Sequence, residues 1–206
     1  ARYKTPRMIS AGFYLSKFLC YPFGMREIEI KLKAPNLELI ASKLKELGCV
    51  LSEPKIQEDR NFIHKDDVKW FEPEILGFAY PRLRFQPGKP TIFTVKKPVS
   101  NESDCVEYEM TTDDPEGMAK MMEMFNYFPG VTVKKTRRTC TYKDYTITLD
   151  EVERLGSFIE IERMVEDGDA LKIQEEMFAF AKDMFGLEKD GFVMRGYDIM
   201  MYHLGK

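Results

Sequence analysis

The segment 26–31, Arg-Glu-Ile-Glu-Ile-Lys, alternates charged and apolar residues almost without a break. A β-strand places successive side chains on opposite faces, so a period of two predicts a strand here. Glu27, Glu29 and Lys31 then share one face, and Ile28 and Ile30 share the other. A solvated edge strand would show the same pattern, so this segment alone does not decide which face is buried.

The same alternation recurs in four later segments that are predicted to be strands, at 82–84, 107–109, 135–137 and 160–162. In an ordinary sandwich the charged faces would point to solvent, and their mixed signs would only favour solubility. The other arrangement is a barrel with a charged lumen and an apolar outer face covered by helices. Its carboxylates would hold a divalent cation, while Lys and Arg would hold a polyanion that also ligates the cation.

These segments resemble, in their order, the motifs of the CYTH superfamily, which includes the class IV adenylyl cyclases (CyaB type) and the thiamine triphosphatases. Residues 27–31 are similar to the family's N-terminal ExExK motif. The resemblance implies a triphosphate tunnel, an α+β fold in which a closed antiparallel barrel of about eight strands carries helices on its outside. The resemblance extends from about Met25 nearly to the C-terminus. Its later matches are at Arg82, Arg84, 94–98, 107–109, 135–138, 149–152 and 155–162.

Composition favours one domain preceded by an extension. A chain of 206 residues, 44% hydrophobic and 32% charged, can bury one core but is small for two packed domains. Residues 1–24 differ in character, because three basic residues precede an apolar stretch too short and too interrupted to cross a bilayer. That stretch lacks a clear small-residue cleavage site. We therefore expect an N-terminal extension at 1–24 and a CYTH domain at 25–206.

Charge and cysteine usage exclude several classes of function. The net charge of −3 gives no general attraction for nucleic acid, so a polyanion must be bound by local positive charge. Four cysteines without CxxC spacing and only two histidines indicate neither a zinc site nor a disulfide framework. We expect a cytoplasmic protein with no nucleic-acid or membrane partner, and the sequence leaves a homodimer open.

Capping residues and periodicity predict the remaining elements. A helix begins at Asn36, with Leu37 and Leu44 on its apolar stripe, and ends before Gly48. A second begins after Asp114, and its Met118, Met121, Met122 and Phe125 are interpreted as core filling. A third runs from Gly168 to Gly186 and turns Leu171, Phe178, Ala181 and Phe185 inward. Further strands are expected at 56–63, 80–85, 91–97, 131–133, 139–142, 145–152 and 157–164, and a loop containing Trp70 at 65–77.

A cation held in this lumen would be a hard one, Mg²⁺ or Mn²⁺, because no Cys or His belongs to the candidate set. A buried ionic network with lumen cations is the alternative role for these acids. Burying so many like charges without a ligand is costly, which favours a metal site. The candidate metal ligands are Glu27, Glu29, Asp150, Glu160 and Glu162.

A triphosphate would be bound by Arg side chains through two bonds each and by Lys side chains as point charges. Strand parity places Lys97 outside the lumen and leaves Arg138 uncertain. Family members often carry an Arg two residues before the middle ExE, where this chain has Cys105, so one phosphate contact is expected to be missing. The candidate phosphate ligands are Lys31, Arg82, Arg84, Lys96, Lys135 and Arg137.

Two reactions suit such a site. In a cyclase the 3′-hydroxyl of ATP attacks the α-phosphorus, and in a triphosphatase water attacks the terminal phosphorus. Glu107, Glu109 and Lys96 are the candidate catalytic residues, with an acid orienting or deprotonating the nucleophile. Chain length and the extended C-terminal region resemble the CyaB-type cyclases more, which favours cyclisation of ATP. The alternatives are hydrolysis of tripolyphosphate, thiamine triphosphate or a nucleoside triphosphate, and a non-catalytic triphosphate sensor.

Overall fold

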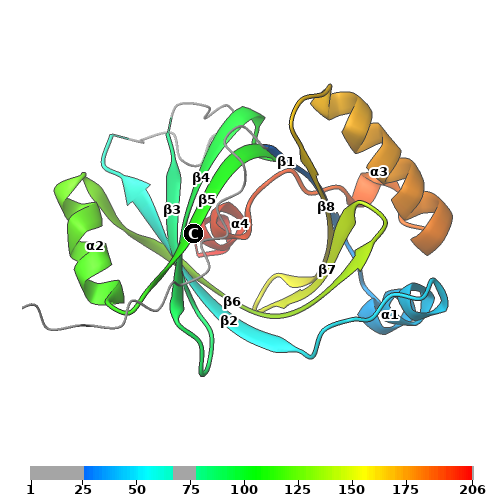
Figure 1. The fold of residues 1–206 in the computed structure, drawn as a ribbon, viewed down its shortest axis with the longest axis horizontal. Coiled ribbons are helices and arrows are strands. Elements are labelled where there is room, and N and C mark those ends of the chain that lie inside the picture. The colour runs from blue at the N-terminus through cyan, green and yellow to red at the C-terminus, as the bar shows by residue number, and fades with distance from the viewer. Residues whose placement is uncertain (1–25, 67–77, 206) are drawn as a thin grey trace, which may run out of the picture.

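The computed structural model describes residues 26–66 and 78–205, which form a closed eight-stranded barrel with helices around it (Figure 1). The expected α+β barrel is confirmed, whereas residues 1–24 and Trp70 lie outside the described ranges. The strands are β1 (Arg26–Lys33), β2 (Lys55–His64), β3 (Tyr80–Phe85), β4 (Thr91–Asn101), β5 (Asp104–Thr112), β6 (Tyr127–Tyr142), β7 (Tyr145–Val152) and β8 (Gly156–Val165). The helices are α1 (Leu37–Glu46), α2 (Pro115–Met124), α3 (Ala170–Phe185) and α4 (Tyr197–Leu204), with a 3₁₀ turn, η1, at Lys189–Gly191.

The strands follow one another around the ring in the order β1-β5-β4-β3-β2-β6-β7-β8, and neighbouring strands are antiparallel. β1 pairs with β8 along its whole length, from Arg26 opposite Val165 to Lys33 opposite Phe158. Its register with β5 contains only two pairs. The Arg26 guanidinium adds a two-bond contact to the Asp104 carboxylate, at 2.9 and 2.8 Å, across this short seam. The ring is therefore closed mainly by its first and last strands.

Strand alternation separates a charged lumen from an apolar outer core. Ile28, Ile30 and Leu32 of β1 are fully buried on the outside of the barrel, in one cluster with residues of α1 and α3. These two helices pack at one end of the molecule, and α2 lies at the opposite end (Figure 1). The hydrophobic residues of these strands are buried on the outer face, under the helices. The residues at the alternate positions of the same strands therefore line the lumen.

The predicted helix ends are confirmed by their capping contacts. The side chain of Asn36 accepts a hydrogen bond from the Leu39 amide, and that of Asp114 accepts one from the Gly117 amide. The backbone at Gly48 and Gly186 has positive φ, at 82° and 70°, as the residue that ends a helix commonly does. The chain therefore leaves α1 and α3 at the two glycines that the sequence indicated.

Three expectations about the elements were wrong. Leu171 is 70% exposed, because it lies two positions, or about 200° of helix rotation, from the buried Ile173. In α2 only Met122 is buried, and it packs against a small patch formed by Phe62 and Leu83, so Met121 and Phe125 stay exposed rather than filling a core. The segments 131–133 and 139–142 belong to one continuous strand, the 16-residue β6.

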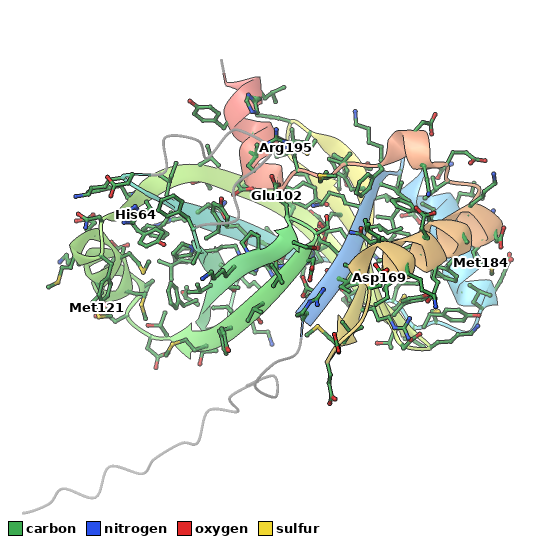
Figure 2. The ribbon with its side chains drawn as sticks, turned by 90° about the horizontal axis from the view of Figure 1, so that it is seen from above. His64, Glu102, Met121, Asp169, Met184 and Arg195 are labelled. Carbon is green, nitrogen blue, oxygen red and sulfur yellow. The ribbon has the colours of Figure 1, made fainter. Side chains whose placement is uncertain are left out.

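Helix α4 stands at one end of the barrel (Figures 1 and 2). Its first residue, Tyr197, belongs to a second small core together with Val133, Val152 and Phe158, and Met200 and Met201 pack against that core. One end of the lumen is thus apolar and is filled by a helix. None of the helices in the described ranges combines the length and apolar character that crossing a membrane requires.

Candidate functional site

The lumen contains a cavity of about 280 Å³ whose wall is dominated by charged side chains. The six candidate phosphate ligands all line it, as do four of the five candidate metal ligands. Asp150 does not line it, because its carboxylate is fully buried in the wall. Among the residues that the structure describes, six basic side chains line the cavity, Lys31, Arg82, Arg84, Lys96, Lys135 and Arg137, and nine acidic ones do so, Glu27, Glu29, Asp59, Glu102, Glu107, Glu109, Glu160, Glu162 and Asp198.

Three carboxylates form a cluster that fits a divalent cation. One oxygen each from Glu27, Glu29 and Glu162 lies within 4.8 Å of the other two, and the β1–β8 register places Glu29 directly opposite Glu162. Burial, and then the charges of Glu27 and Glu160, raise the pKa of Glu162 well above its usual value. Burial also raises the pKa of Glu27, although Lys96 opposes this. A bound cation would relieve this repulsion, and three carboxylate donors suit a hard ion such as Mg²⁺ or Mn²⁺.

Glu160 and Asp150 act in the structure as counterions of Arg137. The Arg137 Nε lies 2.7 Å from an Asp150 oxygen, and its Nη2 lies 2.5 Å from Glu160 Oε2. Lys31 Nζ is also 3.3 Å from Glu160. Burial alone would raise the pKa of Glu160, but Arg137 and Lys31 hold it well below its usual range. The structure therefore brings Asp150 and Glu160 to the cations and leaves the three-carboxylate cluster to Glu27, Glu29 and Glu162.

Asp59 of β2 occupies the centre of the cationic side of the tunnel. Its two oxygens accept hydrogen bonds from Arg84 at 2.7 and 2.8 Å, and Arg82 and Lys135 lie at 3.6 and 3.5 Å. Burial opposes ionisation, but Arg82, Lys135 and Arg84 hold the pKa of Asp59 far below its usual value. Asp59 is not among the site residues that the sequence predicted. The signal was present, because Gln57 and Asp59 share a face in the alternation of that strand.

The three candidate catalytic residues lie together on β4 and β5. Lys96 Nζ is 2.6 Å from Glu27 and 2.7 Å from Glu107, and Arg82 Nη2 lies 3.8 Å from Glu109. Burial opposes the charge on Lys96, but Glu107 and Glu27 raise its pKa well above the usual value. Burial also opposes ionisation of Glu107, yet Lys96 and Arg82 lower its pKa. At neutral pH, Lys96 is therefore an ammonium and Glu107 a carboxylate.

Lys135 differs from the other cations of the tunnel. Burial, and then the charge of Arg137, lower its pKa to about 8, and Asp150 and Asp59 only partly offset this. The two carboxylates lie at 3.6 and 3.5 Å, longer than a charge-assisted hydrogen bond. Lys135 therefore loses its charge at a pH where the guanidinium groups around it keep theirs.

Cys105 lines the cavity where the family resemblance leads one to expect an Arg. Its Sγ donates to the Glu102 carbonyl at 3.3 Å, and burial raises the pKa of the thiol to about 12. A neutral thiol thus replaces a cation in the wall. Lys97 is exposed, and Arg138 points out of the barrel, with Nη1 3.8 Å from Glu38 of α1.

The segment leading into α4 is tied to the tunnel wall. The Gly196 amide donates to Glu102 Oε2 at 3.2 Å, and Arg195 Nη1 lies 3.7 Å from Glu102 Oε1, where Figure 2 labels both side chains. From inside the barrel, Lys31 Nζ reaches the Arg195 carbonyl at 3.5 Å. The sequence did not predict this helix or the place of its Tyr197 in the site. The helix has only eight residues, and the buried ones are covered by the end of the barrel, so it carries little periodicity of its own.

Comparison with known proteins gives a consistent result. A family profile described as the CYTH domain matches residues 25–197, which span the whole barrel. A Methanocaldococcus jannaschii protein named "putative adenylate cyclase" is 28% identical over 176 residues, covering 84% of this chain and 97% of its own. The solved structure of a Pyrococcus horikoshii protein is 26% identical, with a TM-score of 0.68 and coverage of 86% and 99%. A Hippeastrum structure, described as a "putative adenylyl cyclase" with a dominant triphosphatase activity, shares the fold at 17% identity, a TM-score of 0.57 and coverage of 88% and 96%.

Proposed function

This chain belongs to the CYTH domain family, and we propose that it is a metal-dependent enzyme acting on a substrate with a triphosphate group. The observation that carries the proposal is the three-carboxylate cluster, which shares one cavity with six cationic side chains of the described residues. A triphosphate needs cationic side chains for its outer oxygens and a divalent ion to bridge its phosphate groups. The lumen offers basic side chains for the phosphate oxygens and carboxylates for the divalent ion in one cavity.

The side chains divide the chemistry among themselves. Glu27, Glu29 and Glu162 would hold Mg²⁺ or Mn²⁺, which supplies charge neutralisation at the phosphate oxygens and polarises the reacting phosphorus. Arg82 and Lys96 would orient the phosphate chain from the neighbouring strands β3 and β4. Their charges also stabilise the negative charge that develops on phosphate oxygens in the transition state.

We propose cyclisation of ATP to cyclic AMP and pyrophosphate as the reaction. The 3′-hydroxyl attacks the α-phosphorus, and the bond to the pyrophosphate group breaks. Glu107 is ionised and lies beside Lys96, so it can orient the hydroxyl by accepting its hydrogen bond. Its lowered pKa makes it a weak base, so it would receive the proton only as the bond to phosphorus forms. The Methanocaldococcus jannaschii relative named "putative adenylate cyclase", 97% of whose length aligns with this chain, supports this choice.

Hydrolysis of a triphosphate is the second candidate. The cavity wall is dominated by charged groups, which suits a phosphate chain better than a nucleoside. Water bound near Glu107 or Glu109 would then attack the terminal phosphorus, and the same cations would stabilise the transition state. The shared fold with the Hippeastrum protein, whose triphosphatase activity dominates, makes this the natural comparison reaction.

Product analysis distinguishes the two reactions. The protein is incubated with ATP or tripolyphosphate and Mg²⁺ or Mn²⁺, and nucleotides and phosphates are separated by chromatography. Cyclic AMP with pyrophosphate indicates the cyclase, and ADP or free phosphate indicates the hydrolase. Glu29→Gln should abolish turnover of either kind, whereas Glu176→Gln, at a 48% exposed side chain on α3, should leave it unchanged.

Two results would contradict the proposal to different degrees. Binding of tripolyphosphate without turnover of ATP or tripolyphosphate would contradict the enzymatic activity and would favour a non-catalytic triphosphate sensor. Absence of both binding and turnover with either metal would overturn the proposed function altogether.

A further inference from the structure

We propose that the hydroxyl of Tyr197 is a substrate ligand that donates a hydrogen bond to the innermost phosphate group in the tunnel. Helix α4 would then form part of the substrate site, in addition to closing the barrel. The inference rests on the proposed function, since it requires a phosphate chain in the cavity. It adds to that function a specific contact and a direction for the phosphate chain.

The first observation is an unpaired polar group inside the cavity. Tyr197 lines the tunnel and is only 7% exposed. Its hydroxyl is buried, and no hydrogen-bond partner for it is found in the described part of the chain. Glu160 lies near this phenol and raises its pKa both by its charge and by a weak hydrogen-bonding contact, but that contact falls short of full hydrogen-bond geometry. Buried hydroxyl groups nearly always have a partner, so this one is available to a ligand.

The second observation is the protonation state of that hydroxyl. Burial, and then the negative charges of Glu160 and Asp150, raise the pKa of Tyr197 well above that of an ordinary phenol. The group is therefore a neutral O–H at every pH at which the protein is expected to work. A neutral phenol can donate its proton to a phosphate oxygen, whereas a phenolate would repel it.

The third observation is the cations around the ring. Lys31 Nζ lies 4.5 Å and Lys135 Nζ lies 5.0 Å from the ring centroid. Phe158 packs against the same ring, with the centroids 5.1 Å apart, and fixes its position. An anion that binds both ammonium groups is thereby held next to the ring that carries the hydroxyl. The Tyr197 hydroxyl and the two lysine ammonium groups would then donate hydrogen bonds to the same phosphate group.

The direction of the phosphate chain follows from what lies beyond the ring. Val133, Val152 and Phe158 pack around Tyr197, and Met200 and Met201 cover them from α4. A charged phosphate chain cannot continue into this apolar cluster, because its oxygens would lose their solvation without gaining partners. The group at Tyr197 is therefore the end of the phosphate chain, and any organic part of the substrate points away from α4.

The test is Tyr197→Phe, which keeps the ring, its packing on Phe158 and its contacts with both lysines. Calorimetric titration with tripolyphosphate and Mg²⁺ should show binding about tenfold to a hundredfold weaker than in the wild type, as expected for a lost hydrogen bond to a charged group. The unfolding midpoint without ligand should stay the same or rise, because an unpaired hydroxyl is removed. Binding of Mn²⁺ alone, followed by its electron paramagnetic resonance signal, should not change.

Tyr108→Phe is the matched control, because this 45% exposed tyrosine of β5 lies outside the cavity lining. It should bind tripolyphosphate as the wild type does. Wild-type protein that fails to bind tripolyphosphate would contradict the proposed function itself. Wild-type protein that binds, with Tyr197→Phe binding within twofold of it, would overturn only the role of Tyr197.

A second measurement does not depend on the stability of that variant. Wild-type protein with ¹³C at the ζ position of its ten tyrosines is titrated with tripolyphosphate and Mg²⁺. The Tyr197 signal should shift, and it should still shift in Tyr80→Phe, which removes the signal of the other tyrosine lining the cavity. A titration in which no tyrosine signal moves once Tyr80 has been replaced would overturn the inference.

Discussion

Asp59 binds Arg84 through both oxygens of its carboxylate, among the basic side chains that the sequence predicted to be phosphate ligands. The cations that face a substrate are therefore already neutralised by acids of the same wall. Nine acidic and six basic side chains line the described cavity, so its formal charge is negative when every carboxyl group is ionised. We therefore expect a polyanion to enter it together with a divalent cation.

Replacing Asp59 should separate the stability of the tunnel from its affinity. Asp59→Asn leaves Arg84, Arg82 and Lys135 without their shared counterion and should destabilise the protein by about 3–5 kcal/mol. The pKa of Asp59 is lower in the folded than in the unfolded protein, so its ionised carboxylate stabilises the fold at a pH above the unfolded pKa. This stabilisation is lost progressively on acidification, so the difference in stability between wild type and Asp59→Asn should shrink toward low pH. Thermal unfolding from pH 3 to 8 measures this, with Asp144→Asn, at an exposed ion pair with Arg163, as the control.

The same substitution should increase the response to a ligand. The three released cations would gain a new partner in tripolyphosphate, so its stabilising effect in the presence of Mg²⁺ should be larger in Asp59→Asn than in the wild type. A smaller effect would mean that Asp59 positions Arg84 for the substrate instead of competing with it.

Glu162→Gln should stabilise the metal-free protein above neutral pH while abolishing metal binding. The pKa of Glu162 is raised in the folded state, so its contribution to stability is present at low pH and is lost as pH rises toward the folded pKa. Each kcal/mol relieved should raise the unfolding midpoint by about 2–4 °C for a chain of this size. Unfolding at pH 5 and pH 8 with and without Mn²⁺ checks this, and a variant stabilised by Mn²⁺ as strongly as the wild type would contradict it.

Lys135→Arg should change how binding depends on pH. The wild-type affinity for tripolyphosphate with Mg²⁺ should fall as pH rises through about 8, because Lys135 then loses its proton. An Arg keeps its charge, so the variant should bind more tightly than the wild type above pH 9. Lys31→Arg is the control, because Glu29 and Glu160 outweigh burial and raise the pKa of Lys31. Parallel pH profiles of the Lys135→Arg variant and the wild type would contradict the prediction.

Tripolyphosphate should stabilise the protein strongly only together with Mg²⁺ or Mn²⁺. Without the ion, the phosphates meet the repulsion of Glu27, Glu29 and Glu162. Unfolding midpoints are measured with AMP, ATP and tripolyphosphate, each with and without metal. The shift should grow with phosphate number, shrink with salt and shrink in Arg82→Ala. An equal shift in the presence of EDTA would show that the basic side chains bind tripolyphosphate without a metal ion and would contradict the prediction.

Strand parity predicted which side chains face the lumen, because it depends only on local backbone geometry. Lys31, Arg82 and Glu107 line the cavity, as the alternation indicated, and the exposed Lys97 does not. Parity does not say which charges meet across strands. Asp150 was grouped with the metal ligands, but the β6–β7 register places it opposite Arg137.

The contribution of Tyr197 was not predictable for a related reason. Its environment comes from Val133, Val152 and Phe158, which lie on three different strands far away in the sequence. No local pattern around residue 197 carries that information. The N-terminal extension at residues 1–24 stays a prediction, and a homodimer stays open.

The pairing of β1 with β8 also determines when the site forms during folding. Glu27 and Glu29 lie on the first strand of the ring and Glu162 on the last, more than 130 residues later. A chain still being synthesised would have no cation site until β8 has emerged and closed the ring, and such distant pairing is slow to form. Capture of the metal would thus mark the closure of the barrel, and the ion would bind only chains in which β1 has paired with β8.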